Sequence, residues 1–264
     1  MKESGPLKRL FVGWECKVSA YKPFPPGRPI SPPHMTIAFL GNISPDALMS
    51  NLHSFPSYDS PLSTCAIGDI LDFLPPKHPR VAALHVEGLL PEFFLFQKKL
   101  TDWLSALGYT MDPRPFYPHV SLVRAPLDQN KWEKWPTRSP VLFQSIHLYE
   151  SMGSCIYKPI WTYPLLSPFD EIEHTADLAF CIRGRTIEEL HYHAQMALAF
   201  EFPPLIEFIK QQAPADLTSM VILLNELISM ADREVGCPFK AVSFHGEIVK
   251  MENGLLQWEM IIDV

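Results

Sequence analysis

The sequence has no long run of apolar residues. Its apolar stretches stay on the scale of MVILL, at 220–224, far short of the roughly 18 residues that a membrane span requires. The first residues, MKESGPLKRLFVGW, lack the apolar core and small-residue cleavage site of a signal peptide. We therefore expect a cytoplasmic protein with no membrane association.

Cysteine motifs are also missing. The chain contains no C-x-x-C pair, and its five cysteines are an odd number spread widely along the sequence. This pattern argues against a zinc knuckle and against a disulfide framework. We expect buried free thiols at these positions: Cys16, Cys65, Cys155, Cys181 and Cys237.

An overall basic charge is absent, since the net charge is −7. The charge is unevenly distributed: residues 1–165 carry a balance of +3, whereas residues 166–264 carry −10. Such a shift indicates two parts with different partners. Only the first part could bind the phosphate backbone of a nucleic acid favourably. It would do so through a local positively charged cleft rather than through the electrostatic field of the whole protein.

What the chain does contain is typical of a globular protein, with 47% hydrophobic and 19% charged residues. Most of the 27 prolines lie before residue 168, which favours a loop-rich α+β domain there. Residues 91–108 have apolar positions at helical spacing and end on glycine, so we expect a helix. Apolar segments rich in β-formers predict strands at 9–16, 34–40, 80–87 and 117–124, and a hairpin over 141–165.

The segment LLSPFD, residues 165–170, marks a change in pattern. We place a domain boundary here, giving domains at 1–166 and 167–264. The second domain should form a small α+β unit: two strands ending at Gly184, two helices, and a final hairpin around the ENG turn. We expect His191 and His193, which face apart on the first of these helices, to lie on the surface.

Two short segments of the first domain repeat one arrangement. SPPHMTIAFLG places His34 two residues before Thr36, and RPFYPHVSLVR places His119 two residues before Ser121. Because residues i and i+2 of a strand face the same side, each segment presents an imidazole together with a hydroxyl. Two such pairs facing a common cleft could hold a phosphate between the hydroxyls. One histidine would then accept a proton from the attacking oxygen while the other donates one to the leaving oxygen, without a metal.

A single histidine on an apolar strand is more often a structural residue than a catalytic one. The repetition of the spacing, each time with a hydroxyl partner, favours the catalytic interpretation. Both readings remain open on the residues alone.

The two segments resemble the paired signatures of 2H phosphoesterases, especially the RNA 2′,3′-cyclic phosphodiesterases, also called 2′-5′ RNA ligases. RLFVGWE is similar to the opening strand of that family, PPKHPRVAALHV to its middle strand, and LGYTMDPRPFYPH to the approach to its second motif. The resemblance covers about residues 8–165.

This resemblance implies a bilobal fold with pseudo-twofold symmetry and a site that needs no cofactor. His34 and His119 would be the acid/base pair. The phosphate ligands would be Thr36, Ser121 and Arg124, the last matching a basic position often found in the second motif. Ser121 stands where threonine is commoner and keeps the hydroxyl.

The acidic domain contains a second candidate site. Asp177 follows a His-Thr-Ala turn, and the chain ends with Asp263 and the carboxylate of Val264. If the fold brings these oxygens together, they suit Ca²⁺ or Mg²⁺. Taken alone, Asp177 is an ordinary turn or cap residue.

The pattern DEIEHTADLAFCIRGRTIEELHYHAQMAL, followed later by FKAVSFHGEIVKMENGLLQWEMIIDV, resembles archease. That small acidic family assists the GTP-dependent RNA ligase that joins RNA ends in tRNA splicing and repair. The resemblance covers about residues 169–264. It implies a divalent-metal site at Asp177, Asp263 and the Val264 carboxylate, and an RNA ligase as protein partner.

The sequence thus predicts a two-domain RNA end-processing protein. The first domain would hydrolyse a 2′,3′-cyclic phosphate to a 2′-phosphate, with reversible 2′-5′ ligation as a further activity, and the second would assist the ligase. The alternative is a non-catalytic adaptor, in which the histidine pairs bind RNA or a nucleotide and the acidic domain docks the ligase.

Overall fold

The computed structural model describes residues 6–174 and 177–264, and has a mixed α/β architecture with two sheets. The chain forms two compact units. The first comprises residues 1–17, 24–137 and 141–166, and the second comprises 18–23, 138–140 and 167–264. No helix within the described residues is long and apolar enough to cross a membrane.

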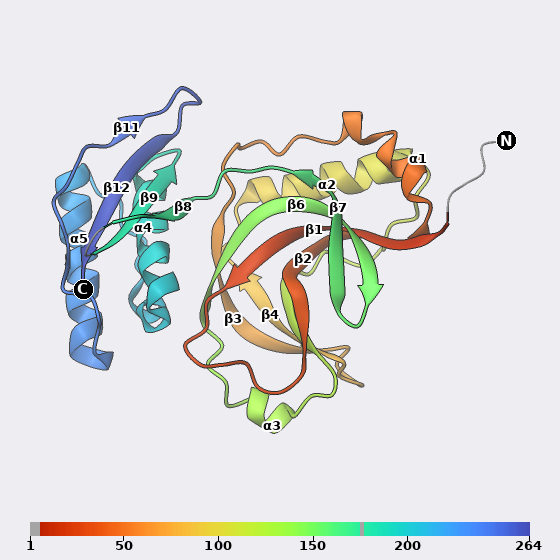
Figure 1. Ribbon diagram of the computed structural model, residues 1–264, viewed down its shortest axis with the longest axis horizontal. Helices are drawn as coiled ribbons and strands as arrows, with labels where there is room; N and C mark the ends of the chain where they lie inside the picture. Colours follow the sequence, from red (N-terminus) through yellow and green to blue (C-terminus); the bar gives the residue numbers. More distant parts are fainter. Residues whose placement is uncertain (1–5, 175–176) are drawn as a thin grey trace. The chain divides into compact units, whose positions relative to one another are not determined.

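The first unit is built around a seven-stranded sheet (Figure 1) in the order β1-β2-β5-β4-β3-β6-β7. Because β1 also pairs with β6, the sheet curls until its order closes into a ring. The strands are β1 (Lys8–Val18), β2 (Arg28–Ile43), β3 (Cys65–Leu74), β4 (Val81–Glu87), β5 (His119–Arg124), β6 (Ser139–Gly153) and β7 (Ile156–Tyr163).

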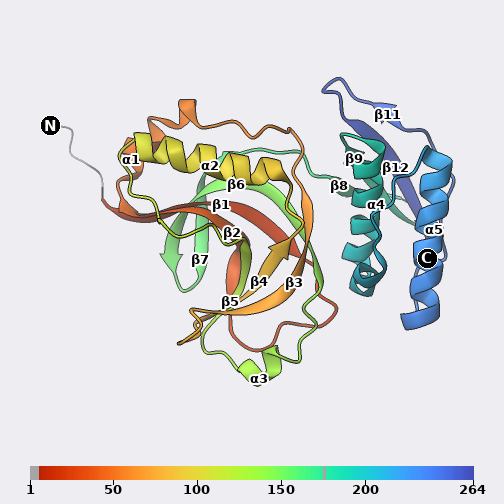
Figure 2. The same ribbon diagram turned by 180° about the vertical axis from the view of Figure 1, so that it is seen from behind.

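The predicted strands and helix of this unit are present, with β2 extending well beyond residues 34–40. The helical segments are α1 (Pro45–Met49), η1 (Leu52–Ser54), α2 (Pro91–Ala106) and α3 (Gln129–Trp132). Helix α2 lies along one side of the strands (Figures 1 and 2) and turns Phe93, Phe96, Leu100 and Leu104 inward. The protein chain turns away from α2 at Gly108, whose φ of 88° is readily adopted only by glycine.

The second unit contains a five-stranded sheet in which β12 is central, pairing with β9, β10 and β11, while β8 pairs with β9. Helix α4 packs on β9 and β12 (Figure 2). The elements are β8 (Phe169–Ile172), β9 (Leu178–Gly184), α4 (Ile187–Glu201), η2 (Pro203–Phe208), α5 (Leu217–Val235), β10 (Ala241–Val242), β11 (Val249–Lys250) and β12 (Leu256–Asp263).

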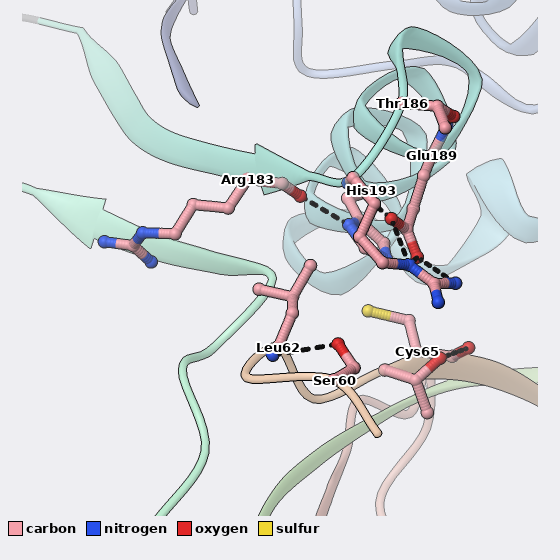
Figure 3. A network of polar contacts seen from close by, with 9 residues as sticks. Ser60, Leu62, Cys65, Arg183, Thr186, Glu189 and His193 are labelled. Carbon is pink, nitrogen blue, oxygen red and sulfur yellow. Dashed lines mark hydrogen bonds and ion pairs between the residues drawn. The ribbon is translucent and has the colours of Figure 1, made fainter. Parts of the chain in front are cut away.

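Helix α4 is capped at its N-terminus by the Thr186 hydroxyl, which accepts a hydrogen bond from the backbone N–H of Glu189. The surface placement of His191 and His193 was wrong, because their side chains are only 2% and 1% exposed. Each ring has a partner for Nδ1 inside the unit: His191 donates to the carbonyl of Gln212, and His193 donates to the carbonyl of Arg183 (Figure 3). Helix α4 is therefore buried on more than one face.

The cysteines are all free. Three are buried, as expected, whereas Cys181 and Cys237 are partly exposed. Burial raises the pKa of the Cys16 and Cys181 thiols, so these groups are inert thiols at neutral pH.

Candidate active site

The two histidine segments lie on neighbouring strands. Strand β2 pairs antiparallel with β5, and His34 stands opposite Ser121, followed by Met35 opposite Val120. Continuing this register places Thr36 level with His119. Each histidine therefore has the hydroxyl residue of the other segment as its cross-strand neighbour, and all four side chains share one face of the sheet.

A pocket of about 570 Å³ opens on this face. Its wall includes all five residues that the sequence singled out in the first domain: His34, Thr36, His119, Ser121 and Arg124. It also includes three further arginines that sequence reasoning missed: Arg9, Arg28 and Arg114. No carboxylate side chain contributes to the described wall, so the pocket suits an anionic ligand.

The two histidine rings are held in the same way. The Nδ1 atom of His34 lies 2.8 Å from the carbonyl oxygen of Pro32, and that of His119 lies 2.8 Å from the carbonyl oxygen of Tyr117. A carbonyl can only accept, so Nδ1 carries the hydrogen in both rings. In the neutral form Nε2 is then the unprotonated atom, available to take up a proton.

His34 lies in an aromatic surrounding and is 5% exposed. Its ring centroid is 4.8 Å from that of Phe11 and 4.6 Å from that of Tyr157. Burial, together with the charges of Arg124 and His119, lowers the pKa of His34 to about 4, against the opposing effect of the hydrogen bond to Pro32. His34 is thus neutral at pH 7 and suited to act as a base.

His119 is less deeply enclosed than His34. Burial lowers the pKa of His119 as well, but its hydrogen bond to the Tyr117 carbonyl and the nearby charge of Asp72 act in the opposite direction. Tyr117 is itself anchored, because its hydroxyl donates to Asp72 and its ring stacks on His85 at 4.7 Å. Of the two histidines, His119 is the better placed to carry a proton.

Arg124 ends β5 and stands opposite Arg28 in the strand pairing. Its Nε atom is buried and has no hydrogen-bond partner among the described residues. A buried guanidinium donor without an acceptor is costly, and a phosphate oxygen in the pocket would satisfy it.

The other arginines had weaker signals in the sequence. Arg9 opens the first strand and places its guanidinium 5.0 Å from the Phe39 ring centroid. Arg114 pairs with Asp112, and Arg28 donates from Nε to the Ala125 carbonyl at 2.6 Å. These residues are scattered along the sequence, so only the fold reveals that they share a pocket.

The turn between β6 and β7 forms another part of the wall. Ser154 and Cys155 have φ values of 50° and 66°, the positive-φ positions occupied by non-glycine residues in the described chain. Two consecutive residues with positive φ are what a two-residue hairpin turn requires. The Cys155 carbonyl accepts the Ser31 N–H at 3.0 Å, which attaches the turn to the strand carrying His34.

The predicted metal ligands of the second unit lie at the ends of two paired strands. Leu178 stands opposite Ile262, so the next positions in the register are Asp177, just before β9, and Asp263, at the end of β12. Nδ1 of His174 is 3.8 Å from Asp177 Oδ2, and Nζ of Lys240 is 2.5 Å from a Val264 terminal oxygen. Lys240 therefore already neutralises the chain end. Thr175 and Ala176 lie outside the described residues.

Comparison with solved structures gives low-identity matches. E. coli LigT complexed with 3′-AMP is 21% identical, with 60% of this chain and 98% of that chain covered and a TM-score of 0.44. A structure described as a phosphoesterase is 21% identical, with coverage of 61% and 98% and a TM-score of 0.44. The Thermus thermophilus protein TT0787 is 18% identical, with coverage of 60% and 97% and a TM-score of 0.39. No family model and no curated protein matches the sequence.

Proposed function

We propose that the pocket of the first unit opens a 2′,3′-cyclic phosphate at the end of an RNA and leaves a 2′-phosphate. The observation that carries this proposal is the crosswise placement of two Nδ1-anchored histidines and two hydroxyls in a pocket lined by arginines. The resemblance of both segments to 2H phosphoesterases supplies the substrate class and the regiochemistry.

In the proposed reaction, Thr36, Ser121 and Arg124 hold the cyclic phosphate. Nε2 of His34 takes a proton from water as the water oxygen bonds to phosphorus. The bond between phosphorus and O3′ breaks, and Nε2 of protonated His119 gives its proton to the departing O3′. One water is consumed, and the product carries a 2′-phosphate and a free 3′-hydroxyl. With an RNA 5′-hydroxyl in place of water, the same steps would join it to phosphorus as the bond to O3′ breaks, which gives a 2′-5′ phosphodiester and supports reversible 2′-5′ ligation.

The chain's own residues supply every proton transfer in this scheme, so the reaction needs no cofactor. Charge developing on the phosphate oxygens is stabilised by the guanidinium of Arg124, whose Nε is buried, and by the two hydroxyls. The low pKa of His34 keeps that ring unprotonated at working pH, which a general base needs.

A defined RNA with a 2′,3′-cyclic end tests this proposal. The full chain should convert it to the 2′-phosphate, identified by ³¹P NMR against authentic 2′- and 3′-phosphates. A 3′-phosphate product would overturn the assigned leaving group. Tight binding without turnover would instead identify a non-catalytic RNA-binding adaptor.

We further propose, from the resemblance to archease, that the second unit binds Ca²⁺ or Mg²⁺ through Asp177, Asp263 and the Val264 carboxylate and assists a GTP-dependent RNA ligase. The supporting observation is the strand register that brings the two aspartates level. A cation would have to displace the Lys240 ammonium from the chain end. Co-purification of the full chain with such a ligase would test the partnership. The Asp177→Asn variant should no longer co-purify with the ligase.

A further inference from the structure

A separate cluster of metal-ligating side chains lies on β3 and β4, outside the pocket wall. Asp69, His85 and Glu87 each place a ligand atom within 4.8 Å of those of the other two. Ligands bound at 2.0–2.2 Å to one ion are at most about 4.4 Å apart. Small side-chain movements would therefore let all three share an ion.

The strands themselves bring the cluster together. His85 and Glu87 are two residues apart on β4 and so face the same side. On β3 the register shifts between Gly68 and Ile70, which stand opposite Val86 and His85, so Asp69 is the extra residue of a β-bulge. Bulges redirect side chains, and this one sets the Asp69 carboxylate beside both β4 ligands.

The cluster is incompletely satisfied by the protein. Oδ1 of Asp69 and Nδ1 of His85 are buried, yet neither has a hydrogen-bond partner in the part of the chain that the structure describes. Among the ion pairs of the described residues, none joins Asp69 or Glu87 to a lysine or arginine. Buried polar atoms normally find partners, so two carboxylates and an imidazole converging without a counterion point to a missing cation.

The His85 imidazole is also held in an orientation that suits metal binding. The His85 ring stacks on Tyr117 with an interplanar angle of 13°, which leaves its in-plane nitrogen lone pair free to coordinate. Tyr117 in turn donates its hydroxyl to Asp72. The ligand ring is thus fixed by contacts that do not use its nitrogen atoms.

We propose that Asp69, His85 and Glu87 bind a divalent transition-metal ion, with Zn²⁺ as the best match. One imidazole nitrogen and two carboxylate oxygens are a ligand set that favours transition metals over Ca²⁺ and Mg²⁺, which prefer oxygen alone. Water would complete the coordination. None of the three ligands lines the pocket, although His85 stands opposite His119 in the pairing of β4 with β5.

Titration of the EDTA-treated and dialysed full chain with CoCl₂ tests the site, because Co²⁺ bound to nitrogen and oxygen ligands absorbs visible light. We expect one equivalent of Co²⁺ to produce an absorption band in the visible range. Added Zn²⁺ should displace the Co²⁺ and remove this band. Asp69→Asn, His85→Gln and Glu87→Gln should each weaken the affinity at least about tenfold.

Two matched variants serve as controls. His78→Gln and Asp102→Asn change exposed residues of the same unit. Both should keep the wild-type band and affinity. Glu87 is exposed, so Glu87→Gln gives a folded test variant, checked by circular dichroism, even where Asp69→Asn misfolds. Absence of Co²⁺ binding by the wild type, or wild-type affinity in Glu87→Gln and His85→Gln, would overturn the proposal.

Discussion

His34 on β2 stands directly opposite Ser121 on β5. This pairing makes one site from two segments that are far apart in the sequence, because the hydroxyl nearest each histidine belongs to the other segment. The two segments should therefore behave as one functional unit.

We predict that His34→Ala and His119→Ala each lower the rate of cyclic-phosphate opening by about 10²–10⁴-fold, the usual contribution of a positioned acid or base. The double variant should lose much less than the product of the two single losses, because either loss already disables the shared proton transfer. Steady-state rates of the three variants test this, with His53→Ala, an exposed residue, as control. Near wild-type turnover in either single variant would refute the assignment.

Arg124 provides a second prediction. Arg124→Lys keeps the positive charge but loses the planar guanidinium and its buried Nε donor. We expect kcat/KM to fall about tenfold or more, while Arg80→Lys, which changes an exposed arginine, leaves it unchanged. Equal kcat/KM in the two variants would mean that Arg124 is only a solvated charge at the strand end.

The pH dependence follows from the two histidines. His34 must be unprotonated, so kcat/KM should rise as pH rises through about 4. His119 must be protonated, and its pKa lies below the usual 6.5. We therefore expect kcat/KM to fall again before neutrality, so that its pH profile is bell-shaped with a maximum at acidic pH.

Arg124→Met gives this profile an internal check. The arginine charge lowers the pKa of His34, so removing it should move the acidic limb to higher pH, whereas Arg124→Lys should leave the limb in place. A rate that keeps increasing above pH 7 would exclude His119 as the acid.

The C-terminal site gives a prediction that does not touch the first unit. Three negative oxygens from Asp177, Asp263 and Val264 would repel one another without a cation, and a bound ion would stabilise the fold by about 2.7 kcal/mol at a hundredfold excess over Kd. Extending the chain beyond Val264, or Asp177→Asn, should weaken Ca²⁺ or Mg²⁺ binding in calorimetric titrations and leave RNA hydrolysis intact. Equal cation affinity in the wild type, the extended chain and Asp177→Asn would mean that Asp177 is an ordinary turn residue.

Local patterns predicted the strands and helices well, since alternation, helical spacing and terminal glycines are encoded in short segments. The spacing of His34 and Thr36, and of His119 and Ser121, also identified side chains that the fold places on one face. The predicted roles of these residues still await the measurements described above.

The rest depended on long-range packing. Arg9, Arg28 and Arg114 become neighbours only through strand pairing, and nothing local marks them. His191 and His193 were expected on the surface because they face apart on a helix, yet both are buried and donate from Nδ1 to backbone carbonyls of other segments. The Asp69 bulge was similarly invisible, because a register shift is a property of two strands.

The most direct test of the central claim is hydrolysis of a 2′,3′-cyclic RNA end by the full chain in H₂¹⁸O with excess EDTA. The two-histidine mechanism predicts undiminished turnover and one ¹⁸O atom in the product 2′-phosphate, detected by mass spectrometry, with both signals lost in His34→Ala and His119→Ala. Loss of turnover in EDTA, or the same ¹⁸O-labelled product from the histidine variants at the wild-type rate, would contradict it.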